Sequence, residues 1–220
     1  MKNIKNLEKD LKRSGIKIKQ DVKLAAYTTI GIGGRVKLFI EVLNTKELEL
    51  AVNLTFKHKV PYLVIGKGSN IIVSDSGYDG LVILNNTNNW QVLGEYANIR
   101  KGLTQSRFKT LNSEYLNLNS DFKQKQINYV IVRADSGLRI GYLMNSLLKE
   151  GITGLQWFAG IPGTVGGAVY MNIHGGDYYF GDIINKAYIT DGKCSREVDH
   201  DYFKFDYDWS ILHKTNEIIL

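Results

Sequence analysis

The residues with the clearest chemical potential form a glycine-rich stretch, GIPGTVGGA, at positions 160–168. Glycine inside a helix or strand costs about 0.5–1 kcal/mol relative to alanine, so glycines this close together predict a loop. The apolar residues Val165, Ala168, Val169 and Met171 then predict a short helix that the loop opens. Bare N–H groups at the start of a helix can bind a phosphate or lie against a flat ring. A glycine turn packed against a neighbouring segment is the alternative, and composition favours neither.

A second glycine motif, GKGSN at positions 66–70, follows an apolar run of strand length, Pro61–Ile65. A strand that ends in this way is a candidate cradle for a pyrophosphate. The glycines allow successive N–H groups to point inward, and Ser69 and Asn70 add side-chain donors. The motif is neither the GxxxxGK[ST] of a P-loop nor the GxGxxG of a dinucleotide-binding fold. A tight turn between two strands is the alternative interpretation.

The sequence around the second motif predicts a βαβ unit that would hold it in place. Alternating residues at 36–42 predict a strand, and apolar positions within 45–58 predict a helix with Thr45 as its N-cap. The run at 61–65 supplies the next strand. A glycine-rich segment, YTTIGIGG at 27–34, precedes the unit. Strand, helix and strand in this order are typical of parallel strands joined by a crossover helix.

The second half of the chain also mixes helices and strands. Before it, residues 85–128 are rich in Asn, Ser, Lys and Gln and have few apolar positions, and we interpret them as a long polar insertion. The elements predicted for the second half are strands at 129–134, 187–190, 194–198 and 216–220 and a helix at 137–150.

Composition limits the class of protein. The chain has 220 residues, of which 44% are hydrophobic and 23% charged, as in an ordinary globular protein. No apolar run approaches the roughly 20 residues of a membrane span, and the N-terminus does not have the pattern of a secretory signal. The single cysteine, Cys194, excludes an internal disulfide and a cysteine-based metal cluster. We therefore expect a cytoplasmic protein without a metal site. The net charge of +6 fits an anionic small ligand or a plain solvated surface, and no motif supports nucleic-acid binding.

Four segments give the chain a specific resemblance to the UDP-N-acetylenolpyruvoylglucosamine reductase family. They are YTTIGIGG at 27–34, VPYLVIGKGSNIIVSDSGYDG at 60–80, GITGLQWFAGIPGTVGGA at 151–168 and NIHGGDYYFGDI at 172–183. A single such segment would be weak evidence. Four in the family's order make an accidental similarity improbable.

The resemblance implies an α+β fold: a two-lobed FAD-binding domain of the vanillyl-alcohol-oxidase/PCMH type, with a small βαβ lobe and a larger mixed sheet with helices. We expect the N-terminal FAD-binding lobe at residues 1–84, the polar insertion at 85–128 and the second lobe at 129–220. The family's C-terminal substrate domain is expected to be absent from this chain. The sequence stops within the apolar strand at 216–220, which suggests that a continuation is missing or lies in another chain.

The resemblance also implies which residues contact a non-covalently bound FAD. The 66–70 motif would hold the pyrophosphate, the 160–168 stretch would line the flavin and adenosine side, and the 27–34 segment would help to close the site. His174 lies near these segments in sequence, and we expect no covalent link between it and the flavin. The expected contacts are Thr29, Gly33, Gly34, Gly66, Lys67, Gly68, Ser69, Asn70, Gly160, Ile161, Pro162, Gly163, Thr164, Gly166, Gly167, Ala168, Asn172, Gly176 and Ile183.

In this family NADPH reduces the FAD, and the flavin then passes hydride to an enolpyruvyl group, which converts UDP-N-acetylglucosamine enolpyruvate to UDP-N-acetylmuramate. The family's catalytic arginine corresponds here to Asp208, whose charge has the wrong sign to stabilise an enolate. The catalytic serine and glutamate of the family belong to the C-terminal domain. We therefore assign no catalytic residue to this chain.

These expectations leave three functions open. The first is a reductase of peptidoglycan precursor synthesis that binds FAD but is incomplete by itself, with NADPH as hydride donor and a nucleotide sugar as substrate. The second is a stand-alone flavin-binding module without reductase activity, for which Asp208 and the polar insertion argue. The third, binding to nucleic acid, is suggested by charge alone.

Overall fold

The computed structural model describes residues 2–96 and 129–220. The chain forms two compact units. The larger unit comprises residues 1–90 and 134–220, and the smaller comprises residues 91–133.

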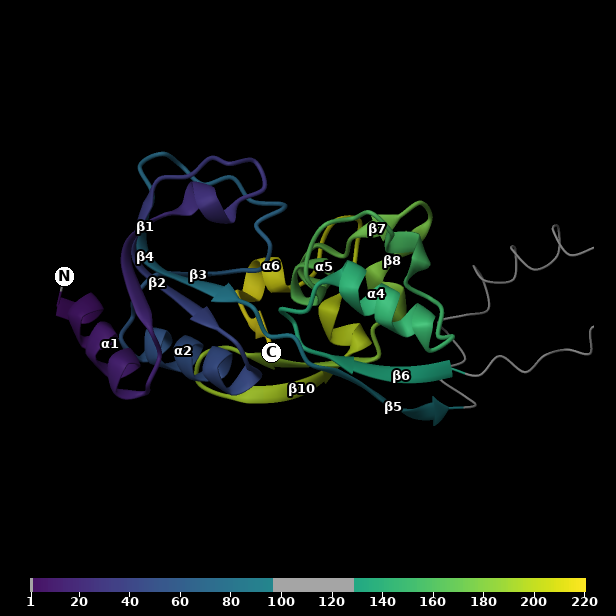
Figure 1. The fold of residues 1–220 in the computed structure, drawn as a ribbon. Helices are drawn as coiled ribbons and strands as arrows, with labels where there is room; N and C mark the ends of the chain where they lie inside the picture. The colour runs from purple at the N-terminus through teal and green to yellow at the C-terminus, as the bar shows by residue number, and fades with distance from the viewer. Residues whose placement is uncertain (1, 97–128) are drawn as a thin grey trace, which may run out of the picture. The chain divides into compact units, whose positions relative to one another are not determined.

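A four-stranded sheet organises the first part of the larger unit (Figure 1). Its strand order is β1-β2-β4-β3, in which β2, β4 and β3 run parallel and β1 pairs antiparallel to β2. The predicted strand, helix and strand of the βαβ unit are therefore confirmed, but β4 lies between the two predicted strands. The four strands are β1 (Ile18–Lys23), β2 (Arg35–Val42), β3 (Tyr62–Ile65) and β4 (Tyr78–Asn85).

Two helices cover one face of this sheet, α1 (Lys2–Arg13) and α2 (Thr45–Lys57) (Figure 1). Leu7 and Leu11 of α1 and Leu48 of α2 are fully buried in a core shared with alternate residues of β2 and β4. This burial of apolar side chains, each of which stabilises the fold by roughly 1.5–3 kcal/mol, fixes the sheet that positions the GKGSN motif.

The opposite face of the sheet has its own small core around Phe39, which is fully buried. The ring of Tyr27 packs on Phe39 with 4.4 Å between the ring centroids. Tyr27 ends the short 3-10 helix η1 (Leu24–Tyr27), so this contact holds the start of the 27–34 segment against the sheet.

The N-cap of α2 differs from the prediction. Asn44, and not Thr45, caps the helix, and its side-chain oxygen accepts a hydrogen bond from the backbone N–H of Glu47 at 3.0 Å. Thr45 is the first helical residue, and its hydroxyl lies 3.4 Å from a carboxylate oxygen of Asp135. Both residue types can cap a helix, so the local sequence does not separate them.

The second part of the larger unit is built from short elements. Its three-stranded sheet has the order β10-β9-β11 and is antiparallel. We had expected a mixed sheet here, but the sheet that mixes strand directions is the four-stranded sheet of the first part. The elements are α4 (Ile140–Lys149), η2 (Gln156–Phe158), α5 (Val165–Met171), β7 (His174–Gly175), β8 (Tyr178–Tyr179), η3 (Phe180–Ile183), β9 (Lys186–Thr190), β10 (Ser195–Asp199), η4 (His200–Phe203), α6 (Leu212–Thr215) and β11 (Ile218–Ile219).

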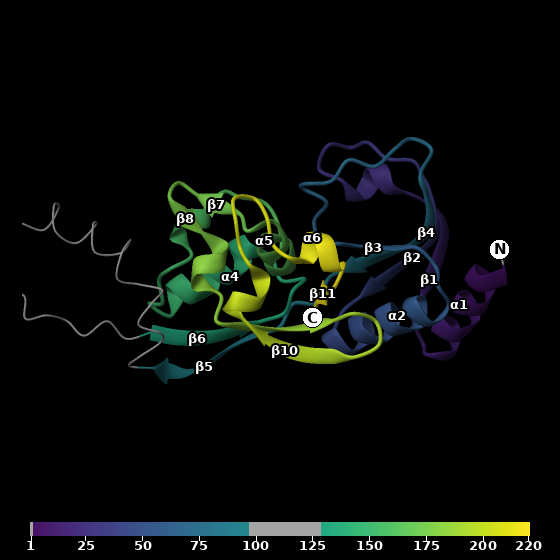
Figure 2. The ribbon, with the colours of Figure 1, turned by 180° about the vertical axis from the view of Figure 1, so that it is seen from behind.

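The C-terminal sheet is tied back to the first part of the chain, as the view from behind shows (Figure 2). The turn between β9 and β10 lies against α2, where a side chain on Gly192 would come within 2.6 Å of Cβ of Phe56. Ile218 and Leu220 pack against the core beneath α2. Glu217, which is buried, is held by an ion pair with Arg196 at 2.6 Å. The last residues of the chain are therefore part of the first core.

The smaller unit contains a pair of strands, β5 (Trp90–Tyr96) and β6 (Tyr129–Ala134), of which the second was predicted with the same bounds. Most of the predicted polar insertion, residues 97–128, lies outside the described residues.

Asp10 connects α1 to α2, and this contact leads to a prediction about pH. Its carboxylate accepts a hydrogen bond from Nε2 of His58 at 2.9 Å, and this bond is the main reason that the pKa of Asp10 is lowered. A lowered pKa stabilises the folded chain while the group is ionised. The contribution is therefore complete above the ordinary carboxyl pKa of about 4 and is lost as the pH falls below it.

We expect Asp10→Asn to lower the melting temperature at neutral pH, and the difference from wild type to shrink as the pH falls toward about 3. Thermal unfolding followed by circular dichroism at a series of pH values measures this difference. Asp79→Asn, which removes an exposed partner of Lys37, is the control and should change the melting temperature less. A loss that is the same at every pH would contradict the role given to Asp10.

Candidate functional site

The GKGSN motif forms a turn directly after β3. Gly68 has a left-handed φ of 62°, and a side chain there would collide with the carbonyl oxygen of Tyr27. The carbonyl oxygen of Gly68 accepts a hydrogen bond from the N–H of Thr29 at 2.9 Å. Gly68 is therefore a glycine both for its backbone conformation and for the close packing of the 27–34 segment.

The inner edge of this turn presents donors without protein acceptors. Within the described part of the chain, the backbone N–H groups of Lys67, Gly68, Ser69 and Asn70 donate no hydrogen bond to protein. Successive free N–H groups around a left-handed residue make a concave site that attracts anions. The arrangement favours the phosphate cradle over the simple turn that the sequence also allowed.

The two glycine motifs meet in space. A side chain on Gly66 would come within 2.5 Å of Oγ1 and 2.7 Å of Cγ2 of Thr164. The hydroxyl of Ser69 donates a hydrogen bond to the carbonyl oxygen of Pro162 at 3.0 Å. The loop after β3 and the loop before α5 therefore support one another, and the Ser69 hydroxyl proton is directed at protein.

The 160–168 stretch is a loop followed by a short helix, as predicted, but the start of that helix does not offer free N–H groups. The N–H of Val165 donates to the carbonyl of Leu138 at 2.9 Å, and the N–H of Gly166 donates to the carbonyl of Ser136 at 2.7 Å. Thr164 is the N-cap, and its hydroxyl and carbonyl oxygens accept from Gly167 and Ala168. A phosphate at this helix end would have to displace these bonds, so the hypothesis of an anion site there is not supported.

The open side of this loop remains available to a ligand. Gly160 is exposed, with a φ of 81° and open space where a side chain would be. Gly163 meets only Ile140 Cδ1 and Ser69 Oγ, both beyond 3.6 Å. Ile161 and Pro162 lie between them in sequence. These residues could face a flat ring, whereas Gly166 packs closely on Ser136.

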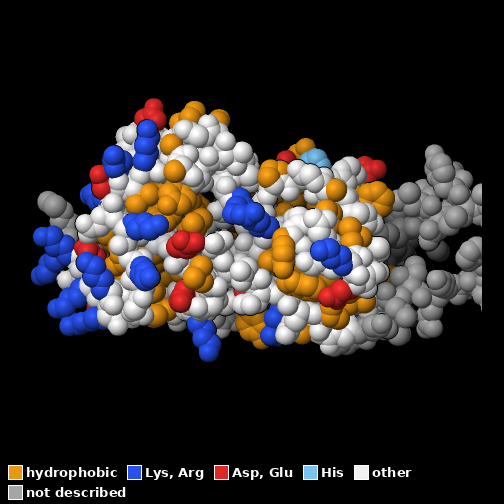
Figure 3. All heavy atoms as spheres, in the orientation of Figure 1, with side chains coloured by type: hydrophobic (Ala, Val, Ile, Leu, Met, Phe, Trp, Pro, Cys, Tyr) orange, Lys and Arg blue, Asp and Glu red, His pale blue; other side chains and the backbone are white. Residues whose placement is uncertain are grey.

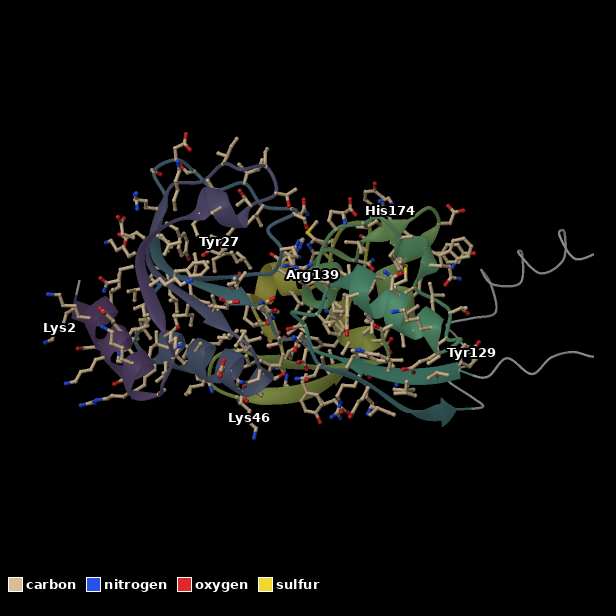
Figure 4. All side chains as sticks on the ribbon, in the orientation of Figure 1. Lys2, Tyr27, Lys46, Tyr129, Arg139 and His174 are labelled. Carbon is tan, nitrogen blue, oxygen red and sulfur yellow. The ribbon has the colours of Figure 1, made fainter. Side chains whose placement is uncertain are left out.

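Two cations flank the contact between the loops. Lys67 belongs to the GKGSN turn, and its pKa is lowered by partial burial and by the nearby charge of Arg139. Arg139 directly precedes α4, pairs with Thr164 in an isolated β-bridge and is exposed. In Figure 4, Arg139 is labelled near the centre of the view, and Figure 3 shows basic side chains at the same place on this face. Arg139 was not predicted from the sequence, because only the bridge to Thr164 brings it beside the motif.

The predicted contacts in the 27–34 segment have packing roles. Gly34 donates its N–H to the carbonyl of Ser74 at 2.9 Å, and a side chain on Gly34 would collide with the carbonyl of Asp75. The carbonyl of Gly33 accepts from Ala25 at 3.1 Å. Thr29 is exposed beside Gly68, so its side chain is the group of this segment that can reach a ligand in the turn.

Asn172, also predicted as a contact, is 3% exposed and uses both ends of its side chain within the protein. Its oxygen accepts from the N–H of Gly181, and its nitrogen donates to the carbonyl of Asp206, both at 2.8 Å. Gly176 faces open space and Ile183 is 41% exposed, so these two are accessible. Asn172 therefore positions neighbouring loops.

His174 and Asp208 lie together on the surface next to Asn172. Nε2 of His174 is 3.7 Å from Oδ1 of Asp208, and the rings of His174 and Tyr207 are 5.1 Å apart. Asp208 has a left-handed φ of 48° in a tight turn closed by reciprocal hydrogen bonds between Asp206 and Trp209. Asp208 therefore lies beside an imidazole.

In the described residues, no group of three His, Cys, Asp or Glu side chains could hold a metal ion. None of the described helices has the length and apolar character needed to cross a bilayer.

The contact between the two glycine loops gives a stability prediction. Gly66→Ala should destabilise the fold by about 1–3 kcal/mol, because the new methyl group overlaps the Thr164 side chain. Thr164→Ala removes the obstructing atoms but costs about 1 kcal/mol through the lost N-cap. The double variant should therefore lose less stability than the sum of the two single variants.

Denaturant unfolding of the four proteins measures these free energies. Gly141→Ala is the control, because this glycine lies in α4 with open space around it and should gain about 0.5–1 kcal/mol or be neutral. Additive losses in the double variant would mean that the loops do not meet at this contact.

Several known proteins are similar to this chain in sequence. A family model described as "FAD binding domain" matches residues 101–192. UDP-N-acetylenolpyruvoylglucosamine reductase of Lactobacillus johnsonii is 30% identical over 213 residues, which are 96% of this chain and 60% of that protein. The enzyme of the same name from Anoxybacillus flavithermus is 33% identical over 201 residues, which are 90% of this chain and 55% of that protein. The chain thus spans about 60% of the length of the first of these relatives.

Solved structures show the same fold. The UDP-N-acetylenolpyruvylglucosamine reductase of Thermus caldophilus superposes with a TM-score of 0.65 over 93% of this chain and 60% of that chain, at 22% identity. An alkyldihydroxyacetonephosphate synthase gives 0.56 over 92% of this chain and 35% of that chain, at 17% identity. A vanillyl-alcohol-oxidase-type flavoprotein of Myceliophthora thermophila gives 0.50 over 76% of this chain and 27% of that chain, at 12% identity. The expected α+β fold of this flavoprotein type is confirmed, and the chain is similar in sequence to UDP-N-acetylenolpyruvoylglucosamine reductases over part of their length.

Proposed function

We propose that this chain binds FAD without a covalent link and serves as the cofactor-binding part of a reductase. The reaction proposed is the NADPH-dependent conversion of UDP-N-acetylglucosamine enolpyruvate to UDP-N-acetylmuramate, in the cytoplasm. The observation that carries the proposal is the turn at Lys67–Asn70, whose N–H groups have no acceptor among the described residues and lie beside two cations. The similarity to the named reductases supports the choice of cofactor and reaction.

The residues of the turn would hold phosphate oxygens of the cofactor's diphosphate, enough for one of its two phosphate groups. Four N–H groups and the ammonium of Lys67 can each donate to phosphate oxygens. The amide of Asn70, which is exposed, can add a further donor. Ser69 contributes its backbone N–H, since its hydroxyl donates to Pro162.

The open loop Gly160–Gly163 would then line the flavin and adenosine side, together with the accessible residues Gly176 and Ile183. Under this proposal the lobes correspond to residues 1–84 and 129–220. Asn172, Gly34 and Gly166 would shape the site through the packing described above, and not by direct contact with the ligand.

When bound, FAD supplies hydride transfer, and the protein supplies binding and orientation. The Thr164 contact fixes the distance between the diphosphate loop and the loop that would face the ring. We assign no proton donor. The Asp208 side chain cannot stabilise a developing enolate, and Nε2 of His174 lies 3.7 Å from its Oδ1.

A second candidate function is a flavin-binding module without reductase activity. The observation that favours it is Asp208 at the position where the family resemblance implies an arginine. Addition of NADPH to the flavin-loaded protein separates the two candidates. Bleaching of the flavin absorbance favours the reductase, and an unchanged spectrum favours the module.

FAD binding itself is tested by titration of the purified chain, followed by flavin fluorescence. We expect wild type to bind FAD more tightly than riboflavin, because the turn recognises phosphate. Lys67→Gln should weaken FAD binding about tenfold or more, since a charge-assisted hydrogen bond contributes about 1.5–3 kcal/mol.

Lys46→Gln serves as the control, because Lys46 is an exposed lysine of α2 away from the turn. Its affinity for FAD should equal that of wild type. Equal affinities for FAD and riboflavin in wild type would mean that the turn does not bind the diphosphate.

A further inference from the structure

We infer that Arg139 is a second cation of a diphosphate-binding site and that it makes the site selective for ligands with two linked phosphates. The inference rests on the proposed function, in which the ligand is FAD. It concerns a residue outside the glycine motifs, which the sequence did not single out.

The backbone places Arg139 beside the turn. Arg139 and Thr164 form an isolated β-bridge, flanked by hydrogen bonds from Ile140 to Gly163 at 3.2 Å and from Val165 to Leu138 at 2.9 Å. Thr164 in turn lies against Gly66. Lys67 follows Gly66 in sequence. The two segments that carry Lys67 and Arg139 therefore both lie against Thr164.

Lys67 and Arg139 bring two positive charges to this part of the site. Among the described residues, neither side chain forms an ion pair with a carboxylate. Glu41 is the acid that acts on Lys67 through its charge, and its own carboxylate accepts a hydrogen bond from Asn86 at 3.0 Å. Burial and the charge of Arg139 together lower the pKa of Lys67.

Two like charges held close together repel each other, and the repulsion is relieved by an anion between them. The N–H groups of the turn and Lys67 suffice for one phosphate. Arginine presents a planar fork of donors that matches a further phosphate group. A linked pair of phosphates can therefore engage both cations, whereas a single phosphate on the turn leaves Arg139 unused.

The side chain of Arg139 is exposed, and the interactions that fix its position are made by the backbone. Arg139→Gln should therefore fold normally. Arg139→Lys keeps the charge without the fork. Arg13→Gln removes an exposed arginine of α1 and is the matched control.

The experiment compares the affinities of these proteins for FAD and for FMN, which has one phosphate. Arg139→Gln should bind FAD about tenfold more weakly than wild type and bind FMN nearly as well. Arg139→Lys should recover part of the loss, and Arg13→Gln should match wild type. An Arg139→Gln protein that binds FAD as tightly as wild type would overturn the inference, and so would an equal loss for FAD and FMN.

A second measurement keeps this test separate from the proposed function. Inorganic pyrophosphate should raise the melting temperature of wild type more than inorganic phosphate does, and Arg139→Gln should lose that difference. If wild type binds no FAD but shows this dependence on Arg139, the proposed cofactor is wrong and the diphosphate site stands. If pyrophosphate stabilises wild type and the variant equally, the role of Arg139 is wrong, whatever the flavin result.

Discussion

The close approach of Gly66 to Thr164 is the contact on which the rest of the candidate site depends. Thr164 caps α5, pairs with Arg139 and lies where a side chain on residue 66 would be. The turn after β3 is thereby held against the loop before α5, and its N–H groups have no acceptor in the part of the chain that the structure describes. A larger residue at position 66 would separate the two loops, and the donors and cations would no longer face one ligand.

The glycines of the two motifs serve packing at least as much as ligand binding. Gly66 and Gly68 allow other segments of the protein to approach, and Gly166 lies on Ser136. Gly160 and Gly176 have open space beside them. The sequence does not separate these uses, because close approach to backbone and close approach to a cofactor both require the absence of Cβ.

Local patterns in the sequence predicted much of the fold. The apolar periodicity predicted β2, α2 and β3. The predicted bounds of β6 were those that the structure shows. The N-cap of α2 was misplaced by one residue, since neighbouring Asn44 and Thr45 are both good caps.

What the sequence did not predict depends on contacts between distant segments. The insertion of β4 between β2 and β3 is a matter of pairing, and no local pattern encodes it. The N–H groups at the start of α5 were expected to be free, but two of them donate hydrogen bonds to the carbonyl oxygens of Ser136 and Leu138 in the turn before Arg139. Arg139 directly follows that turn. The segment that satisfies the start of α5 is thus the one that brings the second cation to the site, and neither effect is visible in residues 160–168 alone.

Under the proposed function, Asp208 stands where the family resemblance implies an arginine, in a turn that is otherwise firmly held. Asn172 is buried and fixes the turn through the carbonyl of Asp206, so Asp208 is presented in a defined position beside His174. An arginine there would carry a permanent positive charge. A carboxyl side chain supplies no positive charge in either protonation state. If the chain takes part in the proposed reaction, the positive charge that stabilises the enolate must therefore come from a group other than Asp208.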